Sequence, residues 1–158
     1  MIKLTRSFPA GGHLFEVREE ADRKVRLEEQ ARQFHRTVAQ LLFLCKRARP
    51  DIEPLISFLT IRVKEPDEDD WGKLRHGLMY LKGTMYMKWH MSADSLNTIR
   101  WWVDASYGVH WDCKGHTGAM TSMGKGATVN MSRKHKLNIR RRRQAQAHSP
   151  PFDAEDKV

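Results

Sequence analysis

The sequence predicts an α+β protein in which three helices are followed by an antiparallel β-meander. Two observations give this prediction. Apolar residues recur every three or four positions from residue 27 to residue 83, which is the spacing of one helix face. After Gly83 the apolar period falls to two, as in a strand, and glycine-rich turns follow. A chain of 158 residues buries a modest core, so one domain, or one and a part, is expected.

Residues 1–26 are expected to form an extended arm, because Pro9, Gly11 and Gly12 precede a charged run. The first helix is predicted over residues 27–48, and Pro50 ends it. Basic residues before that proline suit the negative end of the helix dipole. The apolar stripe of this helix consists of Ala31, Phe34, Val38, Leu41, Leu42 and Cys45.

Two further helices complete the helical region, residues 27–83. Asp51 is predicted to cap the second helix, and Pro54 is tolerated in its first turn. Pro66, at the first position, and the four acids that follow it predict the start of the third helix, which Gly83 closes. A metal cluster is the alternative interpretation of these four acids, but their place at the positive end of the helix dipole is sufficient to explain them.

Four strands are predicted within residues 84–138. They cover residues 85–90, 96–105, 117–123 and 127–131, with a turn at 92–95 and a glycine-rich hairpin at 124–126 (GKG). The run at 96–105 has too many consecutive apolar residues for an exposed edge strand, so we expect it to be buried. Residues 139–158 lack any apolar period and are predicted to be a disordered tail.

The net charge of +9 is concentrated in the last third of the chain. Residues 113–152 contain nine Lys and Arg residues and no acid, whereas the other 19 basic residues are balanced by 19 acids. A localised basic block indicates affinity for a polyanion, most often nucleic acid. The alternative is a solvated basic tail without a partner.

Composition excludes several classes of protein. The N-terminus has a basic start but no apolar core of a signal peptide, and no run approaches the roughly 18 apolar residues of a membrane span. Cys45 and Cys113 lie on different predicted elements and suggest reduced thiols, so a cytoplasmic or nuclear location is expected. The chain also lacks a nucleophile elbow and a phosphate-binding loop.

One carboxylate, Asp104, follows the apolar run at 99–103 and is the candidate metal ligand. Beyond it, His110, Cys113 and His116 have a His-x-x-Cys-x-x-His spacing, which would supply part of a zinc site but lacks a fourth ligand. Three tryptophans suggest a stacking platform for bases. They are Trp101, Trp102 and Trp111. Trp101 and Trp102 are adjacent in a predicted strand and must point to opposite faces, so at most one of these two is expected to be available to a ligand.

Several ordered motifs occur over about residues 11–138. In the helical region they are 34–43 (FHRTVAQLLF), 47–52 (RARPDI), 57–60 (SFLT), 70–74 (DWGKL) and 80–84 (YLKGT). Beyond it they are 102–106 (WVDAS), 110–112 (HWD), 124–127 (GKGA) and 132–134 (SRK). Together these motifs resemble copia-type retrotransposon Pol polyproteins. The resemblance implies a thumb-like region of the reverse transcriptase over residues 27–83, and an incomplete ribonuclease H-like sheet over residues 84–138.

The same resemblance implies a role for Asp104. Ribonuclease H of this family holds two Mg²⁺ ions with several carboxylates, and Asp104 matches the first of them. Ile139 and an Arg run stand where a Ser-Thr-Glu-x-Glu-like helix start is expected, and the Tyr-x-Asp-Asp polymerase signature is absent. We therefore interpret Asp104 as a vestigial catalytic residue in an incomplete metal site. Residues 139–158 are interpreted as a frameshifted tail, and this chain is expected to bind no cofactor.

The sequence thus predicts a fragment of a copia-type polyprotein without independent polymerase or nuclease activity. The alternatives are a stand-alone basic nucleic-acid-binding module and a non-functional pseudogene product. An RNA–DNA hybrid or DNA is the expected partner, with no membrane and no small-molecule substrate. The predicted phosphate contacts are Arg36, Lys46, Arg47, Arg49, Arg133, Lys134 and Lys136.

Overall fold

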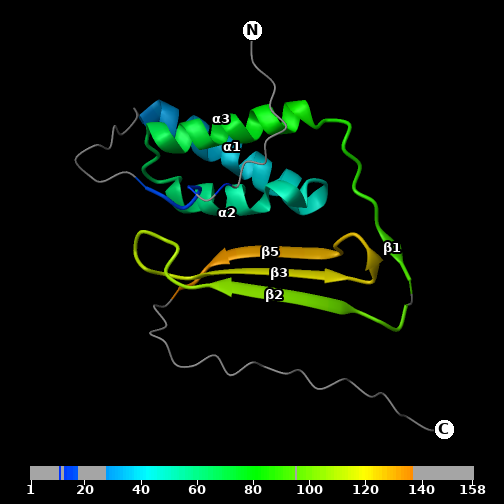
Figure 1. Ribbon diagram of the computed structural model, residues 1–158. Helices are drawn as coiled ribbons and strands as arrows, with labels where there is room; N and C mark the ends of the chain where they lie inside the picture. The colour runs from blue at the N-terminus through cyan, green and yellow to red at the C-terminus, as the bar shows by residue number, and fades with distance from the viewer. Residues whose placement is uncertain (1–10, 12, 18–27, 95, 137–158) are drawn as a thin grey trace, which may run out of the picture.

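The computed structural model describes residues 11, 13–17, 28–94 and 96–136 (Figure 1). These residues form helices α1 (Glu28–Arg47), α2 (Glu53–Arg62) and α3 (Glu68–Gly83), with a 3₁₀ turn, η2 (Pro50–Ile52), before α2. The strands are β1 (Ser92–Ala93), β2 (Arg100–Ser106), β3 (His116–Ser122), β4 (Gly124–Lys125) and β5 (Val129–Lys134). The predicted α+β class is confirmed. No helix in these ranges is long and apolar enough to cross a membrane.

The helical core lies between α1, α2 and α3. The predicted stripe of α1 is largely confirmed, since Phe34, Val38, Leu41 and Cys45 are buried while Leu42 is partly exposed. Helix α2 is apolar on more than one side because it packs against α1 and α3 and also against β5. From the arm, Leu14 joins the same core. The core of this part of the chain is made by Leu14, Phe34, Val38, Leu41, Cys45, Ile52, Leu55, Ile56, Phe58, Leu59, Leu74 and Tyr80.

The helix starts differ in detail from the prediction. Asp67 caps α3 by accepting the backbone N–H of Asp70, and the Asp70 side chain accepts the backbone N–H of Asp67, so Pro66 precedes the cap. Arg62 donates to both carboxylates from α2. The prediction that Asp51 caps α2 was wrong, since the N-cap is Ile52 and Asp51 lies in η2.

The strands form two antiparallel sheets. A three-stranded sheet has the order β2-β3-β5, so its strands follow one another in space as in the chain, and β1 pairs with β4 in a two-stranded sheet. In the larger sheet Asp104 is opposite Gly118, and Gly118 is opposite Ser132. Trp102 and Asp104 lie on one face of β2, while Trp101 and Val103 lie on the other.

Two strand predictions were wrong. Residues 85–90 form no strand but a largely exposed connection, and the predicted turn at 92–95 contains β1. Strand β2 is not buried, because it is an edge strand whose seven residues are all exposed. The apolar content of β2 therefore did not indicate burial, because no helix packs against β2 as α2 packs against β5.

The helices meet the sheet at the edge of β5 (Figure 1). The hydroxyl of Ser57 on α2 donates to the backbone carbonyl of Ser132 at 2.7 Å, and the backbone N–H of Ser132 donates to Glu53 Oε1 at 3.1 Å. The Lys46 ammonium donates to the carbonyl of Asn130 at 3.2 Å. Side chains of the helical layer thus occupy backbone groups of β5 that would otherwise be unpaired.

Two predictions concern segments outside the described residues: the disordered tail at 139–158, and the arm apart from residues 11 and 13–17. Within the arm, Phe15 packs edge-on against Phe58 at a centroid distance of 6.0 Å. Phe15 therefore fixes this part of the arm against α2.

Candidate functional site

Asp104 lies in the middle of β2 rather than at its end. Its side chain is exposed and is on the same face as Trp102. Its cross-strand neighbour Gly118 brings no side chain, and Ser132 on the next strand is neutral. Among the described residues no group of three or more His, Cys, Asp or Glu side chains is arranged to hold a metal ion. Asp104 is therefore a single carboxylate on an open strand.

A groove of about 750 Å³ runs along this face between the sheet and the start of α2. Trp102 and Asp104 contribute from β2, Met120 from β3, and Glu53 and Pro54 from α2. Four of the residues singled out in the sequence line this groove, together with apolar groups and the Glu53 carboxylate: Trp101, Trp102, Asp104 and His116. This lining can hold an apolar or planar group against the sheet. It also contains one imidazole–hydroxyl pair, His116 and Ser132, whose Nε2 and Oγ atoms are 2.7 Å apart.

A second carboxylate, Asp112, lies in the loop between β2 and β3 and does not form a site with Asp104. It forms ion pairs with Lys134 at 2.9 Å and with Lys114 at 3.1 Å. Burial alone would raise the pKa of Asp112, but hydrogen bonds from Lys134 and Lys114 outweigh it and hold the pKa below its ordinary value. Asp112 is therefore a fixed anion that orders its loop against β5.

His110 and His116 form a buried hydrogen-bonded pair, with 3.1 Å between His110 Nε2 and His116 Nδ1. His116 Nε2 is 2.7 Å from the Ser132 hydroxyl, and the Phe15 ring packs against both imidazoles. Burial lowers the pKa of His110 to about 4 and also lowers the pKa of His116. Both rings are held in the neutral form at neutral pH.

The zinc alternative is not supported by this geometry. The two histidines are buried and bonded to each other, whereas Cys113 is exposed and its backbone has a φ of 56°. The thiol of Cys45 lies in the helical core, where burial raises its pKa to about 11, so it is no nucleophile. The His-x-x-Cys-x-x-His spacing gave no indication that Phe15, from the arm, packs against both histidines.

Three of the seven predicted phosphate-binding residues are engaged within the protein. Arg49 donates two hydrogen bonds to Asp51 and also contacts Thr84. Lys46 forms an ion pair with Glu53. Lys134 pairs with Asp112 and lies 3.7 Å from the centroid of the Trp111 ring.

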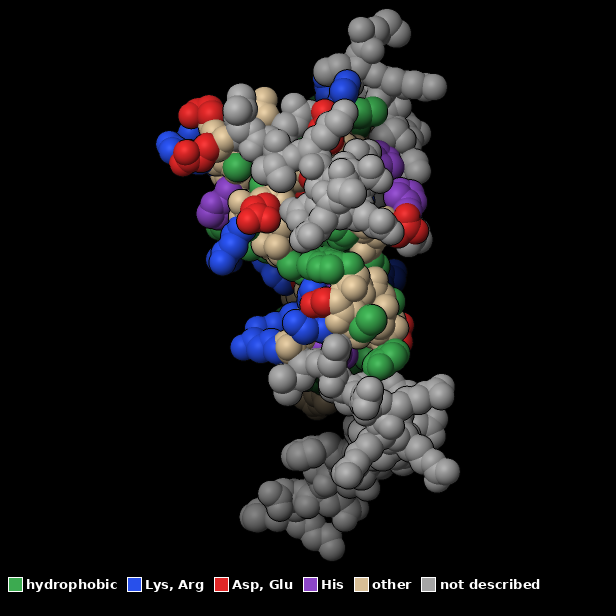
Figure 2. Space-filling model, turned by 90° about the vertical axis from the view of Figure 1, so that its left-hand side faces the viewer, with side chains coloured by type: hydrophobic (Ala, Val, Ile, Leu, Met, Phe, Trp, Pro, Cys, Tyr) green, Lys and Arg blue, Asp and Glu red, His purple; other side chains and the backbone are tan. Residues whose placement is uncertain are grey.

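The other four predicted basic residues are exposed: Arg36, Arg47, Arg133 and Lys136. Arg133 is on β5, on the face opposite to Ser132, and Lys136 follows the strand. Figure 2 shows Lys and Arg side chains projecting from one side of the molecule at the level of the sheet. These residues, rather than all seven, remain as candidates for phosphate contacts.

The tryptophans are more available than the sequence suggested. Trp101 is 70% exposed and Trp102 is 46% exposed, on opposite faces, because β2 is an edge strand. The expectation that at most one is available was therefore wrong. Trp111 is also 46% exposed, but its ring contacts Phe58, Arg62 and Lys134.

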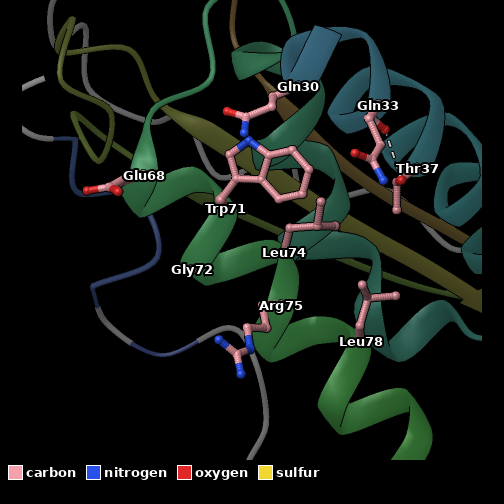
Figure 3. A pocket seen from close by; sticks show the side chains of 9 residues that line it. All are labelled: Gln30, Gln33, Thr37, Glu68, Trp71, Gly72, Leu74, Arg75 and Leu78. Atoms are coloured by element: carbon pink, nitrogen blue, oxygen red, sulfur yellow. Dashed lines mark hydrogen bonds between the residues drawn. The ribbon is translucent and has the colours of Figure 1, made fainter. Parts of the chain in front are cut away.

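A second hollow of about 720 Å³ lies on the helical layer between α1 and α3. Figure 3 shows Trp71, Leu74 and Leu78 along α3, and Gln30, Gln33 and Thr37 along α1. The Thr37 hydroxyl donates to the backbone carbonyl of Gln33 at 2.9 Å. None of the predicted site residues lines this hollow, and only Glu68 and Arg75 among its lining residues are charged.

Comparison with protein-family models, with curated proteins and with solved structures gave no match.

Proposed function

We propose that this chain corresponds to the reverse transcriptase–ribonuclease H region of a copia-type retrotransposon polyprotein, and that it has no independent polymerase or nuclease activity. The observation that carries the proposal is the position of Asp104. It lies on β2, the first strand of the antiparallel sheet β2-β3-β5, which follows three helices in the chain. A thumb-like bundle leading into an incomplete ribonuclease H-like meander has this order of elements.

The chemistry of two-metal hydrolysis is the reason that no activity is proposed. Two Mg²⁺ ions activate water and stabilise the leaving oxygen, and several carboxylates must converge to hold them. Asp104 is exposed beside Gly118 and Ser132, while the carboxylate of Asp112 is held by Lys114 and Lys134. The described residues therefore do not fit a pair of Mg²⁺ ions, and we assign no reaction step to them.

Cleavage of an RNA–DNA hybrid tests this proposal. The full chain and its Asp104→Asn variant are incubated with a labelled hybrid and Mg²⁺ or Mn²⁺. We expect no cleavage above the buffer blank from either protein. Metal-dependent cleavage that Asp104→Asn abolishes would overturn the proposal, because it would show a working site around this carboxylate.

The origin of residues 139–158 has its own test. If this segment is read in a shifted frame, the locus should encode a Ser-Thr-Glu-x-Glu-like helix start in another frame. Its absence would contradict the frameshift. Detection of the endogenous protein by mass spectrometry would separate an expressed chain from a pseudogene product, and fractionation would test the cytoplasmic or nuclear location that we propose.

A second candidate function, nucleic-acid binding, is favoured by the exposure of Arg133 and Lys136 at one end of β5. Cations on an exposed strand end can contact phosphates without the cost of breaking internal ion pairs. The full chain and a version lacking residues 139–158 are titrated with a labelled hybrid at several salt concentrations.

We expect binding that survives the deletion and weakens steeply with salt. Replacing Arg133 and Lys136 by Ala should reduce the slope of log K against log salt by about 2. The matched control is Arg32→Ala, which removes an exposed arginine already paired with Glu28. Loss of all binding on deletion of 139–158 would assign the affinity to the tail alone.

A further inference from the structure

The two edges of the three-stranded sheet are treated differently. The edge of β5 is covered by α2 through Glu53 and Ser57, as described above. The edge of β2 is paired with no strand in the described part of the chain, and it lies on the far side of the sheet from the helices (Figure 1). Its sequence, RWWVDAS, contains no Pro and no Lys, the residues that commonly protect an open edge.

The register shows which backbone groups of β2 are open. In an antiparallel ladder the N–H and C=O of one residue point to the same side, and successive residues alternate. Ser132 points both groups at α2, so its partner Gly118 points both at β2. Asp104, opposite Gly118, therefore bonds to β3. By alternation, the N–H and C=O groups of Trp101 and Val103 point away from β3, toward solvent at the open edge of the sheet.

This edge is complementary to a second copy of itself. When two β2 strands run antiparallel with Trp102 opposite the other Trp102, Trp101 lies opposite Val103, and these residues exchange their outward N–H and C=O groups. Arg100 then lies opposite Asp104, so each copy places a cation against an anion. Two of these three kinds of pair are apolar, Trp102 with Trp102 and Trp101 with Val103, and the third joins opposite charges.

The side chains meet at close range in this register. Trp102 with its copy, and Arg100 with Asp104, fall on non-hydrogen-bonded positions, where opposed side chains are nearest and cross-strand pairs interact most. Trp102 and Asp104 are exposed, and among the described residues Asp104 forms no ion pair, while Arg100 has an exposed one with Asp94 at 3.2 Å. Arg100 and Asp104 would be left unpaired against a strand without complementary charges, but each faces its opposite charge in a second copy of β2.

The helices leave room for this pairing. In a continuous six-stranded sheet the two β5 strands would be five spacings apart, roughly 24 Å at about 4.8 Å each. A helix is about 10–12 Å across, and α2 packs on β5 rather than on β2. Two helical layers can therefore lie on the same sheet without meeting at the new junction.

We propose that two copies of this chain associate through β2 to form a two-fold dimer centred on Trp102. The dimer joins two three-stranded sheets into one of six strands, and Arg100 and Asp104 set the register. This inference does not depend on the function proposed above, because it rests on the open edge and its charges alone.

Charge exchange tests the dimer. Sedimentation equilibrium of the full chain over a range of concentrations gives the dimer dissociation constant. Asp104→Arg or Arg100→Asp alone creates two like-charge pairs in the dimer, and should raise that constant by about tenfold or more. The variant that carries both substitutions restores opposite charges and should return the constant close to the original value.

Two further variants separate pairing through β2 from a general effect of charge and from misfolding. Lys88→Glu reverses an exposed charge outside the sheet and should leave the constant unchanged. Val103→Pro removes one outward N–H without touching the bonds to β3, so it should abolish the dimer while circular dichroism stays that of the folded monomer. A wild-type chain that is monomeric at every concentration overturns the pairing. A double variant as weak as the single ones overturns the register.

Discussion

Glu53 and Ser132, 79 residues apart in the chain, meet where Glu53 Oε1 accepts the backbone N–H of Ser132 at 3.1 Å. The same carboxylate is paired with Lys46 and is 3% exposed. A helix carboxylate thus occupies a backbone donor at the edge of a sheet, where a neighbouring strand would otherwise bind. This contact joins the helical layer to β5, and through β5 to the sheet that contains Asp104.

Replacing Glu53 should weaken the junction between helices and sheet. Glu53→Ala leaves the N–H of Ser132 without its acceptor and removes the carboxylate that pairs with Lys46. We therefore expect a loss of about 1–3 kcal/mol in the free energy of unfolding. Glu53→Gln keeps an acceptor and should lose less. Urea denaturation measures both, with Glu28→Ala as the control, because its exposed pair with Arg32 contributes at most about 1 kcal/mol. Equal effects of Glu53→Ala and the control would contradict this role.

Gly77 and Gly72 on α3 should respond oppositely to alanine. A Cβ on Gly77 would lie 2.5 Å from Leu55 Cδ2, so Gly77→Ala overpacks the contact between α2 and α3 and should destabilise the fold by about 1–3 kcal/mol. A Cβ on Gly72 meets nothing within 4 Å, so Gly72→Ala should stabilise the helix by about 0.5–1 kcal/mol. Thermal unfolding of both variants checks the difference in sign. If Gly77→Ala also stabilises the protein, the close approach of the helices is not as described.

The histidine pair should make stability fall in mild acid. The pKa of His110 in the fold is about 4, below its ordinary value of 6.5, so between these pH values the unfolded chain binds a proton that the folded chain does not. The free energy of unfolding should therefore decrease as the pH falls from about 6.5 to about 4. His110→Gln should give a shallower pH dependence, whereas His35→Gln, at an exposed position, should not. An unchanged slope in His110→Gln would show that this imidazole does not titrate as inferred.

Asp51 should contribute stability that is lost in stronger acid. Burial alone would raise its pKa, but hydrogen bonds from Arg49 and Tyr80 outweigh burial and hold the pKa below its ordinary value of 3.8. The ion pair is therefore complete above that value and disappears as the pH falls through the lower pKa of the folded state. Asp51→Asn should cost about 1–3 kcal/mol at neutral pH. It should also remove this part of the acid sensitivity, as melting curves between pH 2 and 5 would show; the same acid response in Asp51→Asn would argue against the pairing.

Helical periodicity predicted the helical layer well because its cause is local. The stripe containing Phe34 and Val38 gave α1 within one residue at each end, and Pro66 with its acids indicated the start of α3. Periodicity failed at residues 85–90, where the alternation of Met85, Met87 and Trp89 occurs in an exposed connection. An alternating pattern needs a neighbouring strand to become a strand, and no local signal reports that neighbour.

The environment of the candidate site was predicted less well, for the same reason. The sequence placed Asp104 on a strand but could not show that the strand has an open edge. It also could not show that Lys134 would bind Asp112, or that Arg49 would bind Asp51, since these pairs depend on how the chain closes on itself. The buried contact of Phe15 with His110 and His116 joins the arm to a distant loop, and only the tertiary structure reveals it.

The junction between α2 and β5 also bears on the order of folding. Helices α1, α2 and α3 pack in chain order, and strands β2, β3 and β5 also pair in chain order, so these contacts close short loops. Joining Ser57 to Ser132 closes a loop of 75 residues, which carries a larger entropic cost. The two layers should therefore form before they dock, and amide hydrogens at the junction should exchange with solvent sooner than those inside either layer.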